Sequence, residues 1–344
     1  MRFRTLIGTF LLVVAALALG AVWLLRNPVV FPPRPLPAPT ADPARLRADV
    51  EALAAIRPAR NANHPESMEE AARQIARGFA AAGCAPRNQW FEAAGATFRN
   101  VFCRMGPRDA PRVIIGAHYD VDGENNPGAD DNASGVAVML ELARVLSGTV
   151  RPERSIVFAA FSAEETGLHG SRYYVEHMKL YPAGKVMGVI NLDTVGRLGD
   201  GRLLVINSSS AREWKFIFMG AGYVSGVDAE MVTQDLDASD QVSFIEAGVP
   251  AVQIFSGATK DYHRPSDTVE KIDGPGLVKV ASFVREGIVY LAEREEPLSF
   301  AGSAGRKEPS GRPASGGERT ATAGTMPDFS YSGSGVRIGE PSPD

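Results

Sequence analysis

The chain has 344 residues, of which 44% are hydrophobic and 22% are charged, and its formal net charge at pH 7 is -4. This is the composition of an ordinary globular protein, with room for one large domain or two small ones. There is no basic stripe, so the charge pattern argues against a nucleic-acid partner.

Residues 1–26 are predicted to be an N-terminal membrane anchor. The stretch from Thr5 to Leu25 carries no charge. It supplies the roughly 20 apolar residues that a membrane-spanning helix needs, whereas the apolar core of a signal peptide needs only about 7–15. Cleavage after Gly20 is the alternative. Because Arg2 and Arg4 precede the span, we expect an inner-membrane protein whose main domain is periplasmic (extracytoplasmic), or a secreted protein if the segment is removed.

A stiff linker and two helices are expected next. Residues 27–41 are rich in proline, which favours an extended spacer. Asp42 followed by Pro43 is typical of a helix start, with a capping side chain and a proline in the first turn. Ser67 and Glu70 form a capping box, which predicts that a second helix starts there.

Cys84 and Cys103 are the two cysteines of the chain. The segments 84–94 and 97–105 are predicted to form a hairpin that turns near Gly95, which places the cysteines roughly opposite each other. In an exported protein they are expected to form a disulfide. The alternative is two separate buried thiols.

From Arg112 onward, short apolar runs of the buried-strand type alternate with helical stretches. Strands are predicted within 112–120, 154–165, 185–196, 202–209 and 249–257, and helices within 134–146, 170–179, 211–222 and 276–296. This alternation predicts an α/β fold, a three-layer α/β/α sandwich with a mostly parallel central sheet covered on both faces. The main domain is expected to span 42–296. Residues 297–344 are rich in Gly, Ser, Thr and Pro and are expected to be disordered; their end resembles the opening of a PDZ domain.

Acidic residues and histidines follow the predicted strands. They are His118, Asp120, Asp130, Asp131, Glu164, Glu165, Asp193 and His263. In open α/β sheets, ligands bind beyond the carboxyl ends of the strands. Carboxylates that share one cleft repel each other unless a cation is present. Histidine and carboxylate ligands suit zinc, and a carboxylate between two ions gives a two-metal hydrolytic centre.

Five motifs in chain order carry a family resemblance: "HYD", "GADDNASG", "SAEETGLHGS", "NLDTVG" and "DYHRPSDT". Over 42–296 the chain resembles the di-zinc exopeptidases related to bacterial leucyl aminopeptidases and glutamate carboxypeptidase II. The resemblance implies two Zn²⁺ per chain. It assigns His118 and Asp193 to one zinc, Glu165 and His263 to the other, and Asp131 to both as the bridging ligand, with Asp130 a neighbour rather than a ligand.

The same resemblance implies the catalytic residues. Glu164 would be the general base that acts on a zinc-bound water, and Tyr262 would donate a hydrogen bond to the developing oxyanion. Asp120 would orient the imidazole of His118.

The resemblance also suggests substrate contacts. Ser239 and Asp240 occupy the place where family members carry a Ser-Asp-His run, and Gln241 stands where the histidine is expected. Phe244 and Phe255 are candidates for the wall of a substrate pocket, with core packing as the alternative.

The implied function is a metal-dependent aminopeptidase that hydrolyses the N-terminal peptide bond of peptides with a free N-terminus. A glutaminyl cyclase-like enzyme of the same fold is one alternative, and the number of metal ions would distinguish it. A non-catalytic relative that has lost its ligands is the other. The five ligand positions are filled, which argues against the second alternative.

Overall fold

The computed structural model describes residues 2–26, 41–147, 154–178, 185–302, 325–327 and 338–341. The chain divides into two units, Met1–Ala38 and Pro39–Asp344. The first contains helix α1 (Arg2–Arg26). Among the described residues, no helix is both long enough and apolar enough to cross a bilayer. The proline-rich linker lies, apart from Ala41, outside the described residues.

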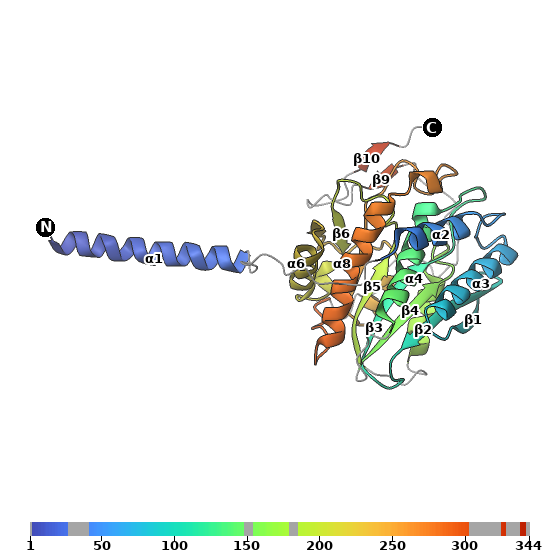
Figure 1. Ribbon diagram of the computed structural model, residues 1–344, viewed down its shortest axis with the longest axis horizontal. Helices are drawn as coiled ribbons and strands as arrows, with labels where there is room; N and C mark the ends of the chain where they lie inside the picture. Colours follow the sequence, from blue (N-terminus) through green and yellow to red (C-terminus); the bar gives the residue numbers. More distant parts are fainter. Residues whose placement is uncertain are drawn as a thin grey trace, which may run out of the picture. The chain divides into compact units, whose positions relative to one another are not determined.

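The second unit is built on an eight-stranded mixed sheet (Figure 1). The strands are β1 (Arg87–Ala93), β2 (Ala96–Met105), β3 (Arg112–His118), β4 (Ser155–Phe161), β5 (Val186–Leu192), β6 (Leu203–Ile206), β7 (Ala229–Met231) and β8 (Ala251–Phe255), in the order β1-β2-β4-β3-β5-β8-β6-β7. The four central strands β4, β3, β5 and β8 run parallel to one another. β1 and β2 are antiparallel at one edge, and β6 is antiparallel to β8 near the other. The carboxyl ends of the four central strands therefore meet at one edge of the sheet.

Helices cover both faces of this sheet, as the three-layer prediction requires. The helices are α2 (Pro43–Ala54), α3 (Pro65–Ala81), α4 (Gly135–Leu146), α5 (His169–His177), α6 (Trp214–Ser225), α7 (Gln241–Glu246) and α8 (Gly274–Glu293). Successive strand side chains point to opposite faces. Val113 and Ile115 of β3 accordingly join the large core with α2, α3, α4 and α8, while Ile114 joins a smaller core with Tyr174 of α5 and Phe244 of α7.

The helix starts show one confirmed cap and one correction. α2 begins at Pro43, and Asp42 Oδ1 accepts the backbone N–H of Ala44 at 2.8 Å, as predicted. The capping box predicted at Ser67 is wrong, because α3 already begins at Pro65. Proline has a fixed φ suited to a first helical turn and lacks the N–H that would be left unpaired there, so the helix starts with it.

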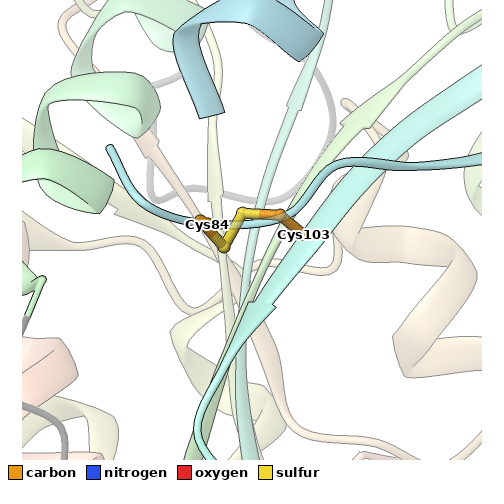
Figure 2. The surroundings of a disulfide bond; sticks show 2 residues. All are labelled: Cys84 and Cys103. Carbon is orange, nitrogen blue, oxygen red and sulfur yellow. A yellow bond between two sulfur atoms is a disulfide. The ribbon is translucent and has the colours of Figure 1, made fainter. Parts of the chain in front are cut away.

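The predicted hairpin is formed by β1 and β2, with Ala93 opposite Ala96 and Gly95 in the turn at φ 79°. A disulfide joins Cys84 and Cys103, whose Cα atoms are 5.7 Å apart (Figure 2). Cys84 lies between α3 and β1, and Cys103 lies on β2, so the bond ties the end of α3 to the sheet. Both side chains are buried in the large core.

Reducing the Cys84–Cys103 disulfide should lower the free energy of unfolding by about 3 kcal/mol, since it closes a short loop in the unfolded chain. Urea unfolding with and without reductant measures this difference. A C84A/C103A double variant is the control, because reductant should not move its midpoint. Equal midpoints for oxidised and reduced wild-type protein would contradict the prediction.

The main domain extends past the boundary predicted at Glu296. Leu298 is buried in the large core, and its N–H donates to the carbonyl oxygen of Met187 at 3.0 Å. The N–H of Ala301 donates to the carbonyl oxygen of Ser210 at 2.9 Å. Further along, β9 (Thr325–Pro327) and β10 (Ile338–Pro341) pair as a two-stranded antiparallel sheet. The rest of the predicted tail, 303–324, 328–337 and 342–344, lies outside the described residues.

Candidate metal centre

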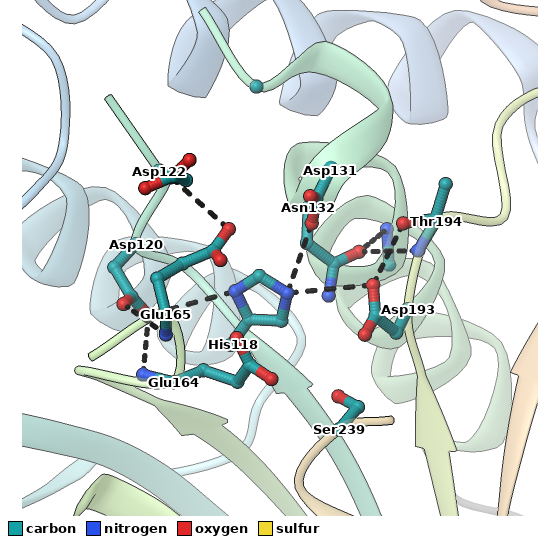
Figure 3. Close-up of polar contacts among 12 residues, drawn as sticks. His118, Asp120, Asp122, Asp131, Asn132, Glu164, Glu165, Asp193, Thr194 and Ser239 are labelled. Carbon is teal, nitrogen blue, oxygen red and sulfur yellow. Dashed lines mark hydrogen bonds and ion pairs between the residues drawn. The ribbon is translucent and has the colours of Figure 1, made fainter. Parts of the chain in front are cut away.

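Four of the predicted ligands, His118, Asp131, Glu165 and Asp193, come together at the carboxyl ends of the central strands (Figure 3). His118 is the last residue of β3, and Asp193 directly follows β5. Glu165 lies in the turn after β4, and Asp131 lies in the turn that precedes α4. His263 comes from the loop that follows β8. Segments that are far apart in the sequence thus contribute one side chain each.

The two oxygens of Asp131 face two different histidines. His118 Nε2 lies 3.2 Å from Asp131 Oδ1 and 3.5 Å from Asp193 Oδ1. His263 Nε2 lies 3.0 Å from Asp131 Oδ2 and 3.3 Å from Glu165 Oε2. The donor atoms therefore form two sets, one with His118 and Asp193 and one with His263 and Glu165, and Asp131 belongs to both.

These distances fit a pair of zinc ions. Four ligands at about 2.0–2.1 Å from a tetrahedral zinc lie about 3.3 Å from one another. Donor atoms of His118, Asp131 and Glu165 lie within 4.8 Å of one another. In the part of the chain that the structure describes, His263 Nε2 and Asp131 Oδ2 are buried without a hydrogen-bond partner. A cation bound between the donor sets would satisfy both atoms.

The charges of the site lead to the same conclusion. Burial raises the pKa of Glu165 well above its usual range, and the carboxylate of Asp131 raises it further. Burial by itself lowers the pKa of His118, but Glu164 and Asp193 outweigh burial and raise that pKa well above its usual range. Without a cation, Glu165 therefore tends to stay neutral and His118 tends to stay protonated and positively charged. A divalent ion removes that conflict.

Two aspartates that follow β3 form hydrogen bonds and ion pairs with the predicted ligands and with the turn that carries Glu165. Asp120 Oδ1 and Oδ2 accept the backbone N–H groups of Glu164 and Glu165, each at 3.1 Å, and Asp120 Oδ1 lies 3.7 Å from His118 Nδ1. Asp122, which the sequence reasoning missed, donates its N–H to Glu165 Oε1 at 3.2 Å. Its Oδ2 lies 3.5 Å from Nδ1 of His263. The alternation of acids in "HYDVD" was the available signal for this residue.

The turn with the sequence "GADDNASG" is held in place by hydrogen bonds to neighbouring segments. Asn132 Oδ1 accepts the N–H of Gly135 at 3.0 Å, and Asn132 Nδ2 donates to the carbonyl oxygen of Leu192 at 2.8 Å, so the turn is tied to the end of β5. Gly128 has φ 57°, and a Cβ there would clash with Val121 Cγ1. Asp130, expected to be a neighbour rather than a ligand, accepts the N–H of Gly196 at its Oδ1 at 2.7 Å.

Arg60 is a second residue that the sequence reasoning missed. It is 1% exposed, and its guanidinium donates to four backbone carbonyl groups. These belong to Leu53, Tyr119, Pro127 and Gly128, at 2.7–3.0 Å. Burial lowers the pKa of Arg60 to about 10, so it remains cationic at neutral pH. The loop after β3 and the acidic turn are joined through this one side chain, and an isolated arginine in a loop gives no sequence signal of such a role.

Tyr262 stacks on the imidazole of His263, with ring centroids 3.8 Å apart. Burial raises the pKa of its phenol well above the usual range, and the nearby carboxylates, led by Asp131 and Glu165, raise it further. The hydroxyl therefore keeps its proton at neutral pH and remains a hydrogen-bond donor.

The segment of Ser239 and Asp240 lies buried beside the site. Ser239 Oγ accepts from Asn191 Nδ2 at 3.0 Å, and Asp240 is completely buried. Gln241, which departs from the family pattern, donates from Nε2 to Asn207 Oδ1 at 2.9 Å. The amide of Gln241 thus ties the segment into a buried network of polar side chains.

Phe244 and Phe255, for which core packing was the alternative to a substrate wall, are both buried in apolar clusters. Phe244 is 1% exposed and packs against the rings of Phe161 and Tyr174 in the smaller core. Phe255 is 4% exposed and packs with Leu204 in a third apolar cluster. The apolar residues of "VSFIEAGVPAVQIF" belong to α7, which packs on the sheet, and to β8, which is one of its central strands.

Comparison with known proteins identifies a family to which the sequence is similar. The model of peptidase family M28 matches residues 100–288, more than half of the chain. Aminopeptidase YwaD of Bacillus subtilis (strain 168) is 33% identical over 194 residues, which cover 54% of this chain and 42% of YwaD. The chain thus spans less than half the length of that curated relative.

Two solved structures share the fold. BSAP, a zinc aminopeptidase from Bacillus subtilis, has a TM-score of 0.66 at 20% identity, covering 78% of this chain and 98% of its own. A glutaminyl cyclase from Bacteroides thetaiotaomicron has a TM-score of 0.61 at 22% identity, and the match covers 73% of this chain and 98% of the cyclase. At these identities the likeness concerns architecture. The family match, which includes all five converging ligand positions, shows that the chain belongs to peptidase family M28.

Proposed function

We propose that this protein is a di-zinc aminopeptidase that removes the N-terminal residue of peptides. The observation that carries the proposal is the position of Asp131, whose two oxygens face two separate donor sets. His118 and Asp193 would hold one ion, and His263 and Glu165 the other. When bound, the ions would polarise the scissile carbonyl group and lower the pKa of a water molecule at the site.

Glu164 would act as the general base. Its backbone N–H donates to Asp120, and its side chain extends past the imidazole of His118 (Figure 3). Burial raises the pKa of Glu164 well above its usual range, so this carboxyl group accepts a proton more readily than an exposed glutamate does. Glu164 would take a proton from the attacking water and return it to the leaving amine. The protonated hydroxyl of Tyr262 would donate to the oxyanion.

The excess of carboxylates favours a substrate with a positive end. Asp120, Asp131, Glu164, Glu165 and Asp193 surround the site, whereas the guanidinium of Arg60 faces backbone carbonyl groups and that of Arg197 is paired with Asp261 and Asp267. A free α-ammonium group would be attracted to such a site. The names of two relatives, aminopeptidase YwaD and the zinc aminopeptidase BSAP, support the same substrate class.

A glutaminyl cyclase is the second candidate, because one shares the fold. The presence of both donor sets favours the peptidase. The same feature argues against a non-catalytic relative, since no ligand position has been lost.

A panel of aminoacyl anilides and their N-acetylated forms tests the proposal with the purified full-length protein. We expect hydrolysis of the free-amine substrates alone, loss of activity on chelation, recovery with zinc, and two zinc ions per chain. Hydrolysis of the acetylated substrates would contradict the free-amine requirement. Cyclisation of a glutaminyl peptide with one zinc per chain would favour the second candidate.

Zinc affinity should fall as the pH is lowered from about 8 to 6. Burial lowers the pKa of His263, but Asp131 outweighs burial and raises that pKa above its usual value near 6.5. Because the imidazole then holds its proton to higher pH, zinc must displace that proton in order to bind. Competition with a chromophoric chelator at pH 6, 7 and 8 measures the effect. A zinc affinity that does not change with pH would contradict it.

We further propose that the main domain works outside the cytoplasm. The Cys84–Cys103 disulfide supports this location, since structural disulfides persist in oxidising compartments. The test is to denature the protein directly from cells without reductant and to label its thiols. Two reactive thiols per chain would contradict an oxidising location.

A further inference from the structure

We infer that Arg197 is a positioning residue of the metal centre, which holds the turn of Asp131 and the loop of His263 in one arrangement. The inference rests on the proposed function, because it concerns the ligands of the proposed ions. Arg197 lies in the loop after β5, and its N–H donates to the hydroxyl of Ser256, just beyond β8, at 3.3 Å. The loop that carries the guanidinium is thus tied to the neighbouring central strand.

The guanidinium of Arg197 contacts carboxylates on both sides of His263. Nη1 donates to Asp261 Oδ2 at 3.3 Å, and Nη2 donates to Asp267 Oδ1 at 3.2 Å. Asp261 comes shortly before His263 in the chain and Asp267 shortly after it. One planar side chain therefore fixes both ends of the loop that presents the imidazole.

Asp267 extends this support to the shared ligand. Its Oδ2 accepts the N–H of Asp131 at 3.0 Å and the N–H of Asp130 at 2.9 Å. Asp267 is 1% exposed, and a buried carboxylate that loses its cation is costly to keep in place. Without Arg197, Asp267 would no longer be held in the position from which it fixes the backbone of Asp131.

The loop of His263 needs such a restraint. His263 has φ 57°, in the left-handed region that a residue with a Cβ rarely adopts. In this conformation its Nε2 reaches Asp131 Oδ2 and Glu165 Oε2. A loop released from Asp261 and Asp267 would relax toward commoner backbone angles and carry the imidazole away from the ligand set.

An arginine suits this place better than a lysine. Asp130, Asp261 and Asp267 all face the guanidinium, with Nε 3.8 Å from Asp130 Oδ2. Lys271 is a second cation in the cluster, and its Nζ contacts Asp261 Oδ1 at 2.5 Å. Within the described residues, the ion pairs of Asp267 involve Arg197 alone. A point charge cannot contact carboxylates on both sides of the loop as a planar fork does.

The test compares Arg197→Gln, Arg197→Lys and, as a control, Arg202→Gln in the full-length protein. Arg202 pairs with Asp228 and Glu230 on the surface and is 57% exposed. Zinc stoichiometry and zinc affinity are measured by competition with a chelator. The visible spectrum is recorded after Co²⁺ is loaded in place of zinc, and the melting temperature is measured on the metal-free protein. We expect Arg197→Gln to weaken the affinity for the less tightly held ion by about 10–100-fold and to alter the Co²⁺ spectrum.

Arg197→Lys should lose less affinity, since the positive charge remains, and Arg202→Gln should match the wild type. A folded Arg197→Gln protein with wild-type zinc affinity at both positions would overturn the inference. If Arg197→Gln does not fold without metal, Arg197→Lys decides: a several-fold loss of affinity supports the inference, and wild-type affinity overturns it. Wild-type protein that binds no zinc would instead contradict the metal centre itself, so the two failures are distinguishable.

Discussion

Glu164→Gln should lower kcat for an aminoacyl anilide by roughly 10²–10⁴-fold. Glutamine keeps the shape of the side chain but cannot accept the proton of the attacking water. The backbone N–H of residue 164 would still donate to Asp120, so the turn that carries Glu165 should keep its position. The variant should therefore bind two zinc ions and fold like the wild type while losing catalysis.

The measurement is kcat and KM together with zinc content and melting temperature. Glu246→Gln is a matched control, since Glu246 is an exposed residue that pairs with Arg172. Its kinetics should equal those of the wild type. A Glu164→Gln enzyme with more than a tenth of the wild-type kcat would show that another group serves as the base.

Asp131→Asn should reduce activity by roughly 10³-fold or more and lower the zinc content below two per chain. Each oxygen of Asp131 faces a different histidine, His118 or His263. Whichever way an asparagine amide is turned, its NH₂ group would face one of the two donor sets. An N–H donor repels a cation, so at least one ion should be lost.

Asp130→Asn is the matched control, one residue away. Burial and the nearby Asp267 raise the pKa of Asp130 to about 8, so its side chain is largely neutral at pH 7. An amide can still accept the N–H of Gly196, as Asp130 does. Asp130→Asn should therefore retain both zinc ions, measured by metal analysis after gel filtration. Equal zinc loss in both variants would contradict the assignment of Asp131 as the bridging ligand.

The sheet and the ligand set were largely predictable because their signals are local. Apolar runs such as 112–118 and 186–192 are buried on both faces, and each is followed by an acid or a histidine where its strand ends. The order of the central strands brings those ends together, and the family resemblance assigns the individual ligands among them. The short elements β7 and α7 were missed, because runs of a few residues leave too little periodicity to detect.

The supporting residues could not be predicted, because their roles depend on tertiary packing. Arg60 and Arg197 act through backbone carbonyl groups and carboxylates brought together by folding. Phe244 and Phe255 show the converse, since an aromatic residue near a motif is as well suited to a core as to a pocket. The start of α3 was misplaced because Pro65 governs it more strongly than the capping box of Ser67.

The two donor sets differ in their access to solvent. The side chain of His118 is 1% exposed, whereas that of His263 is 25% exposed. In the proposed di-zinc site, the ion beside His263 should therefore exchange with ions in solution faster than the ion beside His118. Brief incubation of the zinc-loaded protein with Co²⁺ should then replace one ion selectively and yield a mixed-metal enzyme, in which the spectrum of the single Co²⁺ reports on the His263 side alone.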